Sequence, residues 1–285
     1  MNCMFFNARS ITQKTQEINL FTSTQKIDLA IIAESRLKEN QDSPFHNTIV
    51  NISAKEHQGG ILAFSPTGKL KNSLLLSSGN NWQIIQFDDL IIGFGYFAPS
   101  DPFSDIELFL ESIEKESNTW QEDVIIVADF NARHSQSTGD HANNSRGSKF
   151  FELISRYPIQ LERALVGLYT TNNAAGQGIT DLLFSASGNK YTISDFIIHQ
   201  DNLNGSDHWP LTWSVDVEIK SLPRSWNFKK LISNSEIRLD YSSFLELNYM
   251  WIVEYIEKSL VEILIQRQNA ELNCIETQQA TINHL

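Results

Sequence analysis

The sequence has little cysteine, with only Cys3 and Cys274 near the opposite ends of its 285 residues. Two cysteines this far apart in sequence give neither a disulfide framework nor metal-ligand spacing, so we expect two reduced thiols. Long apolar runs are also lacking, and no segment reaches the about 20 residues that a membrane helix needs. The start, MNCMFFNARS, meets polar residues too early for a signal peptide. We therefore expect an intracellular protein that is neither secreted nor inserted in a membrane.

Positive charge is scarce as well, because 22 lysines and arginines stand against 34 acidic residues and leave a net charge of -12. This balance disfavours a protein that holds nucleic acid through a broad basic surface, since phosphate neutralisation supplies most non-specific affinity. It does not exclude a metal-dependent phosphoesterase, whose clustered carboxylates hold a divalent cation. The hydrophobic content of 41% suffices for the core of one large domain, or of one domain with an appendage.

Short apolar runs alternate with polar or amphipathic segments from residue 3 to about residue 217. Runs of this kind predict strands, several of them buried on both faces. The expected strands span 3–8, 28–35, 59–65, 82–87, 90–98, 123–130, 179–186, 192–198 and 209–217. The expected helices span 12–25, 104–118 and 145–156. This order of elements predicts two packed sheets with helices outside.

Two local signals refine this outline. Ser104 and Glu107 have the spacing of a capping box at the start of the second helix. Asp88 and Asp89 stand between two expected strands and indicate a hairpin turn, so the sheet should be mixed rather than purely parallel.

The character of the chain changes after residue 217. The segment KSLPRSWNFKKL carries clustered basic residues and a proline and indicates a linker. Residues 242–268 predict a long helix, and such a helix more often packs on its own domain or on a neighbour than it does chemistry. We therefore expect a domain at 1–217 and a linker with a helical tail at 218–285, with 242–268 as a segment for association.

Polar residues recur at the ends of the expected strands, where a sheet edge presents a functional site. Asn7 ends the first strand and Glu34 ends the second. A carboxylate there is costly unless it is solvated, paired or bound to a metal, so Glu34 alone fits a ligand and an exposed edge residue equally. Asp129 and Asn131 follow the run VIIVA on one face of the chain, a pair that suits water activation and donation to a phosphate. The alternative is that both residues cap the next turn.

A second pair comes from later in the chain. Asp181 lies inside the apolar run ITDLLFS, where an unpaired charge is unfavourable, so a partner is expected. The segment GSDH supplies His208, whose imidazole needs an orienting carboxylate to act on a phosphoryl group near neutral pH. Taken alone, GSDHWPL also fits a simple turn that leads into a strand.

Read in order, FNARS, IIAES, GYFAPS, VADFNAR, ITDLLFS and GSDHWPL resemble the motifs of the endonuclease/exonuclease/phosphatase superfamily, the deoxyribonuclease I-like fold. The resemblance covers 1–217 and implies a four-layer α/β sandwich, two packed mixed sheets flanked by helices, here with a C-terminal helical extension. Within the superfamily the chain is most similar to the endonuclease domain of non-LTR retrotransposons, on DFNARHSQSTGDHANNSRGSKFFELI and SWNFKK. No reverse transcriptase follows, so the resemblance implies a fragment, a decayed copy or a domesticated remnant of such an element.

The resemblance also implies a metal site. Glu34 would be the principal Mg²⁺ ligand, with Asn7 beside it and Asp207 also facing the metal region. Mn²⁺ is an expected substitute. Taken by themselves, Arg133 and His134, directly after DFNA, fit either proximity to DNA, which we expect, or a simple place in a loop.

The same resemblance assigns the catalytic roles. Asp129 would orient or deprotonate the attacking water, Asn131 would position that water and the scissile phosphate, and Tyr96 would contact the phosphate. Asp181 would hold His208, which would stabilise the charge of the pentacovalent phosphorus or carry a proton.

Two positions depart from the pattern of the superfamily. Ala128 stands where a glycine usually precedes DFN, a small change that still permits close packing. Phe97 replaces the histidine that secreted deoxyribonucleases of this superfamily carry, so their second acid/base pair is missing and that branch is disfavoured.

The resulting hypothesis is a Mg²⁺-dependent DNA endonuclease that leaves a 3′ hydroxyl and is nuclear if its substrate is chromosomal. One alternative is a phosphoesterase of the same fold that acts on inositol phosphates or phospholipids, although no basic cluster or apolar extension suits such substrates. The other is a catalytically inactive remnant that serves as an interaction module, against which stands the complete set of motif residues.

Overall fold

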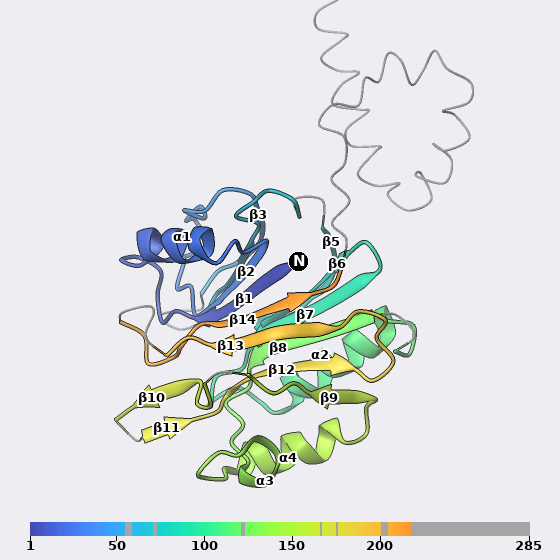
Figure 1. The fold of residues 1–285 in the computed structure, drawn as a ribbon. Helices are drawn as coiled ribbons and strands as arrows, with labels where there is room; N and C mark the ends of the chain where they lie inside the picture. Colours follow the sequence, from blue (N-terminus) through green and yellow to red (C-terminus); the bar gives the residue numbers. More distant parts are fainter. Residues whose placement is uncertain are drawn as a thin grey trace, which may run out of the picture. The chain divides into compact units, whose positions relative to one another are not determined.

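Two six-stranded mixed sheets form the frame of the protein (Figure 1). The structure is a computed structural model that describes residues 1–54, 59–70, 73–120, 123–165, 167–174, 176–200 and 205–217. The first sheet has the order β13-β14-β1-β2-β4-β3, and the second has the order β5-β6-β7-β8-β12-β9. A separate hairpin pairs β10 with β11. The expected tail helix at 242–268 lies outside the described residues, so its part in association stays a prediction.

The bounds of the strands follow the chain. The first sheet contains β1 (Asn2–Asn7), β2 (Leu29–Ala33), β3 (Thr48–Ile52), β4 (Ile61–Phe64), β13 (Ile193–Ile198) and β14 (Leu211–Val215). The second contains β5 (Leu74–Ser78), β6 (Trp82–Phe87), β7 (Leu90–Tyr96), β8 (Asp123–Asp129), β9 (Ile159–Leu161) and β12 (Asp181–Ala186). The hairpin contains β10 (Thr171–Asn173) and β11 (Gly176–Gly178). The helices are α1 (Thr15–Thr24), α2 (Ser104–Glu116), α3 (Ser135–Thr138) and α4 (Ser145–Ile154).

The layers follow from which faces of the strands are apolar. Side chains of both sheets, such as Phe5 of β1 and Phe94 of β7, share one buried cluster between the sheets. The outer face of the first sheet is covered by α1, through Ile18. The outer face of the second is covered by α2 and α4, through Phe109 and Phe150 (Figure 1). This helix, sheet, sheet, helix order confirms the expected four-layer α/β sandwich.

All nine expected strands are present, with ends that shift by only a few residues. Five further strands among the described residues were not expected: β10 and β11 form the separate hairpin, and β3, β5 and β9 each form an outer edge of a six-stranded sheet. An edge strand has one unpaired side and a partly exposed surface, so it lacks the continuous apolar run that marks a central strand.

The local signals had mixed outcomes. The turn at Asp88 and Asp89 is confirmed, since β6 and β7 pair antiparallel on either side of it. The capping box is wrong, because Ser104 is already the first helical residue and Phe103, at the N-cap, makes no side-chain cap. Among the described helices, none is long and apolar enough to cross a membrane.

Candidate active site

Strand register brings three polar side chains together at one end of the second sheet. β7 and β8 run parallel, and Tyr96 lies opposite Asp129. β12 runs antiparallel to β8, so its first residue, Asp181, also lies opposite Asp129. Residues directly opposite each other on paired strands project to the same face of the sheet. The two acids and the phenol therefore converge although they lie far apart in sequence.

The first sheet contributes Asn7 and Glu34 to the same place. Asn7 ends β1, and Glu34 directly follows β2, which is the parallel neighbour of β1. The Asn7 amide donates to Glu34 Oε1 at 3.1 Å and to Asp129 Oδ2 at 2.9 Å. All three side chains are buried. A single amide thus joins the polar ends of the two sheets.

His208 enters on the loop that precedes β14. Because β14 is antiparallel to β1, the start of β14 lies at the end of β1 where Asn7 stands. Ser206 Oγ donates to the Asn7 carbonyl at 2.7 Å and accepts the His208 backbone N–H at 3.1 Å. Lys14 Nζ donates to the Gly205 carbonyl at 2.8 Å, and the loop is thereby fixed at two points.

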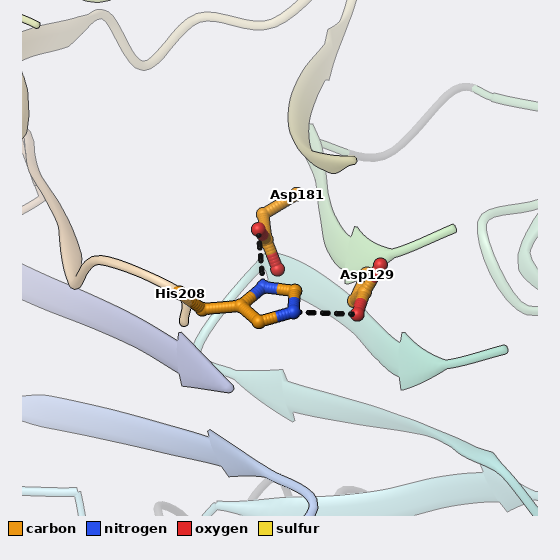
Figure 2. A group of neighbouring side chains, drawn as sticks. All are labelled: Asp129, Asp181 and His208. Carbon is orange, nitrogen blue, oxygen red and sulfur yellow. Dashed lines mark hydrogen bonds and ion pairs between the residues drawn. The ribbon is translucent and has the colours of Figure 1, made fainter. Parts of the chain in front are cut away.

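His208 lies between the two acids of the second sheet (Figure 2). Its Nδ1 is 2.8 Å from Asp181 Oδ2, and its Nε2 is 3.8 Å from Asp129 Oδ2 and 4.0 Å from Asp207 Oδ1. Burial alone would lower the pKa of His208, but the charges of Asp181 and Asp129 outweigh it and raise the pKa to about 9. The imidazole is therefore protonated near neutral pH and held in one orientation by Asp181.

The surroundings of Asp129 favour its neutral form. Burial, and next the charge of Asp181, raise the pKa of Asp129 to about 7, against the opposing effects of His208 and Asn7. A carboxyl with a pKa in this range can take up and release a proton at neutral pH. Burial and the adjacent carboxylates of Glu34 and Asp129 also raise the pKa of the Tyr96 phenol, which hydrogen-bonds to Glu34. Tyr96 is therefore a neutral hydrogen-bond donor.

The oxygen atoms at this edge fit a divalent cation. By spacing, Asp129, Asp181 and His208 form a group that could hold a metal, but the 2.8 Å bond to Asp181 already occupies His208 Nδ1. Mg²⁺ prefers oxygen ligands and keeps several waters, so one or two carboxylates suffice. Glu34 is such a carboxylate, and the buried Oδ1 of Asp207 has no hydrogen-bond partner among the residues that the structure describes. An orphaned carboxylate oxygen in an acidic cluster is the feature that a hard cation would satisfy.

Two arginines that the sequence did not single out neutralise the first sheet's side of the site. Arg36 Nη2 lies 3.0 Å from Glu34 Oε2, and Arg9 Nη1 lies 2.8 Å from Asp207 Oδ2. Glu34, Arg36 and Arg9 have φ values of 47°, 56° and 47°, in the left-handed region that non-glycine residues rarely adopt. Such residues cluster at functional sites, where the surrounding structure enforces them. No periodicity or motif announces this backbone, so the sequence carried no signal for it.

Asn131 also has a left-handed backbone, with φ of 51°. Its N–H donates to Asp129 Oδ1 at 3.0 Å, and its side-chain amide donates to the Phe97 carbonyl at 3.0 Å. The turn after β8 therefore holds Asp129 in place and is tied to the segment after β7.

The segment NNSRG, residues 143–147, supports the turn after β8 through hydrogen bonds. Asn144 caps α4 by accepting the Gly147 N–H at 2.6 Å, and it also accepts the Arg133 N–H and donates to the Asn131 carbonyl. Gly147 lies so near that an added Cβ would sit 2.0 Å from the Arg133 carbonyl oxygen. Arg146 Nη2 donates to the carbonyls of residues 98, 99 and 101. These residues shape the site from outside it.

Arg133 and His134 both have partners inside the protein. Arg133 forms a forked pair with buried Asp140 and donates to the Gln177 carbonyl of β11 at 2.7 Å. His134 Nδ1 accepts the Ser137 N–H at the start of α3, and its ring packs on Phe151. Contact of either side chain with DNA stays a prediction.

Comparison with known proteins agrees with the fold. Residues 90–212 match the family model described as "Endonuclease-reverse transcriptase". No curated protein matches the chain.

Several solved structures are similar to it. The endonuclease domain of TRAS1, a telomere-specific non-LTR retrotransposon, has 19% identity and a TM-score of 0.57 over 74% of this chain and 96% of that one. A 3′-5′ exonuclease from Neisseria meningitidis has 12% identity and a TM-score of 0.59, and an AP endonuclease from Archaeoglobus fulgidus has 15% and 0.58. Each of these two alignments covers 76% of this chain and 100% of the other. With its two packed sheets and outer helices, the chain has the four-layer α/β sandwich fold of these structures, and residues 90–212 are similar to the endonuclease-reverse transcriptase family.

Proposed function

We propose that this protein is a Mg²⁺-dependent endonuclease of retrotransposon origin that hydrolyses a DNA phosphodiester and leaves a 3′ hydroxyl. The observation that carries the proposal is the row Asp181, His208, Asp129, in which the imidazole is held at 2.8 Å by one acid and faces the other. Glu34 is connected to this row through Asn7. Action on chromosomal DNA would make the protein nuclear.

The residues divide the work of hydrolysis. Asp129 takes a proton from the attacking water while the water oxygen forms its bond to phosphorus and the bond from phosphorus to O3′ breaks. The departing O3′ takes a proton from solvent and becomes the 3′ hydroxyl. His208, as imidazolium, stabilises the negative charge that develops on the phosphoryl oxygens, and Asp181 fixes its orientation.

Glu34, Asn7 and Asp207 would hold the cation. When bound, Mg²⁺ or Mn²⁺ supplies Lewis-acid charge stabilisation at the phosphate. Tyr96, a neutral phenol beside Glu34, is available to donate a hydrogen bond to a phosphate oxygen. Asn131 would position the water and the phosphate from the turn after β8.

The test is nicking of supercoiled plasmid by the full chain, with Mg²⁺ and with EDTA. We expect Mg²⁺-dependent nicking that Asp129→Ala and His208→Ala each reduce by at least about 10²-fold, a typical value for general acid and base groups. His199→Ala is the matched control, because His199 is a half-buried histidine whose ring also bonds to one side chain, that of Thr212, and it lies outside the site. Extension of the nicks by a DNA polymerase, with no phosphatase step, reports the 3′ hydroxyl.

Other outcomes would contradict the proposal. Equal nicking by wild type and both variants would refute the proposal. Faster turnover of soluble inositol phosphates than of plasmid would favour the phosphoesterase alternative, and no turnover of either would favour an inactive interaction module.

A further inference from the structure

Glu34, the residue proposed to hold the cation, already has a partner on each carboxylate oxygen. Oε1 accepts from Asn7 at 3.1 Å, and Oε2 accepts from the Arg36 guanidinium at 3.0 Å. Tyr96 adds a further hydrogen bond. A divalent cation on this carboxylate would compete with these donors, and the positively charged guanidinium would oppose it most strongly.

Exposure distinguishes which donor can move. Asn7 is 1% exposed and Tyr96 is 7% exposed, and each also lies beside Asp129. The side chain of Arg36 is 33% exposed, while that of Glu34 is 9% exposed. Arg36 is therefore the partner that can rotate into solvent and be hydrated there, whereas the other two would leave buried polar atoms unpaired.

The backbone holds Arg36 in this place. Glu34 and Arg36 both have left-handed φ values, and the buried Ser35 stands between them. The N–H of Ser35 donates to the Gly60 carbonyl, and that of Arg36 donates to the Gly59 carbonyl, each at 3.1 Å. These two bonds fix the turn, so the guanidinium can leave Glu34 and return to it without any change in the backbone.

We propose that Arg36 is an internal counter-ion that occupies the cation position on Glu34, and that its displacement sets the affinity of the protein for the metal. This inference rests on the proposed function, since it takes Glu34 as the metal ligand. Two positive charges compete for one carboxylate, so removal of the guanidinium should strengthen cation binding. A partly exposed ion pair is worth about 1 kcal/mol, which corresponds to a gain of roughly five- to tenfold in affinity.

The experiment measures Mn²⁺ binding to the metal-free full chain, by electron paramagnetic resonance of free Mn²⁺ and by calorimetry. We expect Arg36→Met to bind Mn²⁺ roughly five- to tenfold more tightly than wild type, and Arg36→Lys to stay close to wild type because it keeps the charge. The thermal unfolding midpoint of each variant in EDTA shows that it is folded. The shift of this midpoint on Mn²⁺ addition gives a second readout that does not involve activity.

Lys69→Met is the matched control. Lys69 pairs with Asp28 at 2.9 Å, and Asp28 directly precedes β2, whereas Glu34 directly follows it. The control removes the same charge from a carboxylate at the opposite end of the same strand, and it should leave the Mn²⁺ affinity unchanged.

The outcomes separate the inference from the proposed function. If wild type binds Mn²⁺, Glu34→Gln abolishes binding and Arg36→Met binds no more tightly than wild type, the counter-ion proposal is overturned and the metal site stands. An equal gain in Arg36→Met and Lys69→Met would also overturn it, because the gain would then reflect net charge alone. If wild type binds no Mn²⁺ and neither Arg36→Met nor Arg36→Lys does, the proposed metal site itself fails.

Discussion

The two sides of the candidate site are built in different ways. On the second sheet, Asp129 and Asp181 are placed by strand register and hold His208 between them, all of them buried. On the other side, Glu34 and Asp207 are each neutralised by a partly exposed arginine whose own backbone is left-handed. Under the proposed function, the side that would handle protons is rigid before substrate arrives, while the side that would hold the ion keeps its charge in exchangeable pairs.

The largest effect should come from breaking the rigid side at Asp181. Asp181→Asn keeps the shape of the side chain but removes the charge that orients and stabilises the imidazolium, so we expect nicking to slow by about 10²- to 10⁴-fold. Single-turnover nicking with Mg²⁺ measures this. Asp123→Asn is the control. Asp123 is a buried acid at the start of β8 that pairs with Lys190, and we expect its replacement to leave nicking unchanged. If Asp181→Asn nicks within a few fold of the wild-type rate, the Asp181 charge is not needed to orient and stabilise the imidazolium.

The next effect is a dependence of stability on pH. The folded-state pKa of His208 is raised from 6.5 to about 9, so the folded state binds the imidazole proton more tightly than the unfolded state does. Its contribution, on the order of 3 kcal/mol, should be fully present below about pH 6.5 and be lost as the pH rises through about 9. Urea unfolding in EDTA across this window measures it. His208→Asn should lack the decline, and a wild-type profile identical to that of the variant would contradict the strong pairing.

A smaller effect should come from the Ser206 hydroxyl, which connects the two sides of the site by hydrogen bonds. Ser206→Ala removes the hydroxyl that links the Asn7 carbonyl to the His208 N–H, so we expect a loss of about 1 to 2 kcal/mol and nicking slowed by about tenfold. Ser214→Ala is the matched control, because Ser214 Oγ donates to Asn2 at the far end of the same strand pair. It should cost stability without slowing nicking. Equal nicking rates in the two variants would show that the loop at 205–208 does not need the Ser206 hydrogen bonds for activity.

The central strands could be predicted from the sequence, because a strand that is buried on both faces must be a continuous apolar run. The polar residues at their ends, Asn7 and Asp129, stood out for the same reason, since each interrupts such a run. The edge strands β3, β5 and β9 could not be found in this way, because exposure on one side removes the pattern.

Two pairings in the site, Asp181 with His208 and Asn7 with Glu34, were expected from the resemblance, whereas the other pairings were not predicted. Asp181 meets Asp129 only because β12 lies antiparallel beside β8, and the order of strands in a sheet is a property of the whole fold. The arginine partners were hidden for another reason. Arg9 and Arg36 look like ordinary charged loop residues until the left-handed turns that aim them are known. The sequence therefore predicted the acids and the histidine that the structure brings together, but not the arginines that balance their charge.

The position of β1 has a consequence for how the protein is made. Of the described strands, β1 leaves the ribosome before all others, yet one of its neighbours is β14, with Asn2 opposite Ser214. The other neighbour, β2, is available early, but one edge of β1 stays without its hydrogen-bond partner until nearly all of the domain has been synthesised. Pairing over such a sequence separation slows folding, and an open strand edge can pair with another chain. Fragments that stop before Leu211 should therefore aggregate during translation, and the first sheet can close only when its last strand arrives.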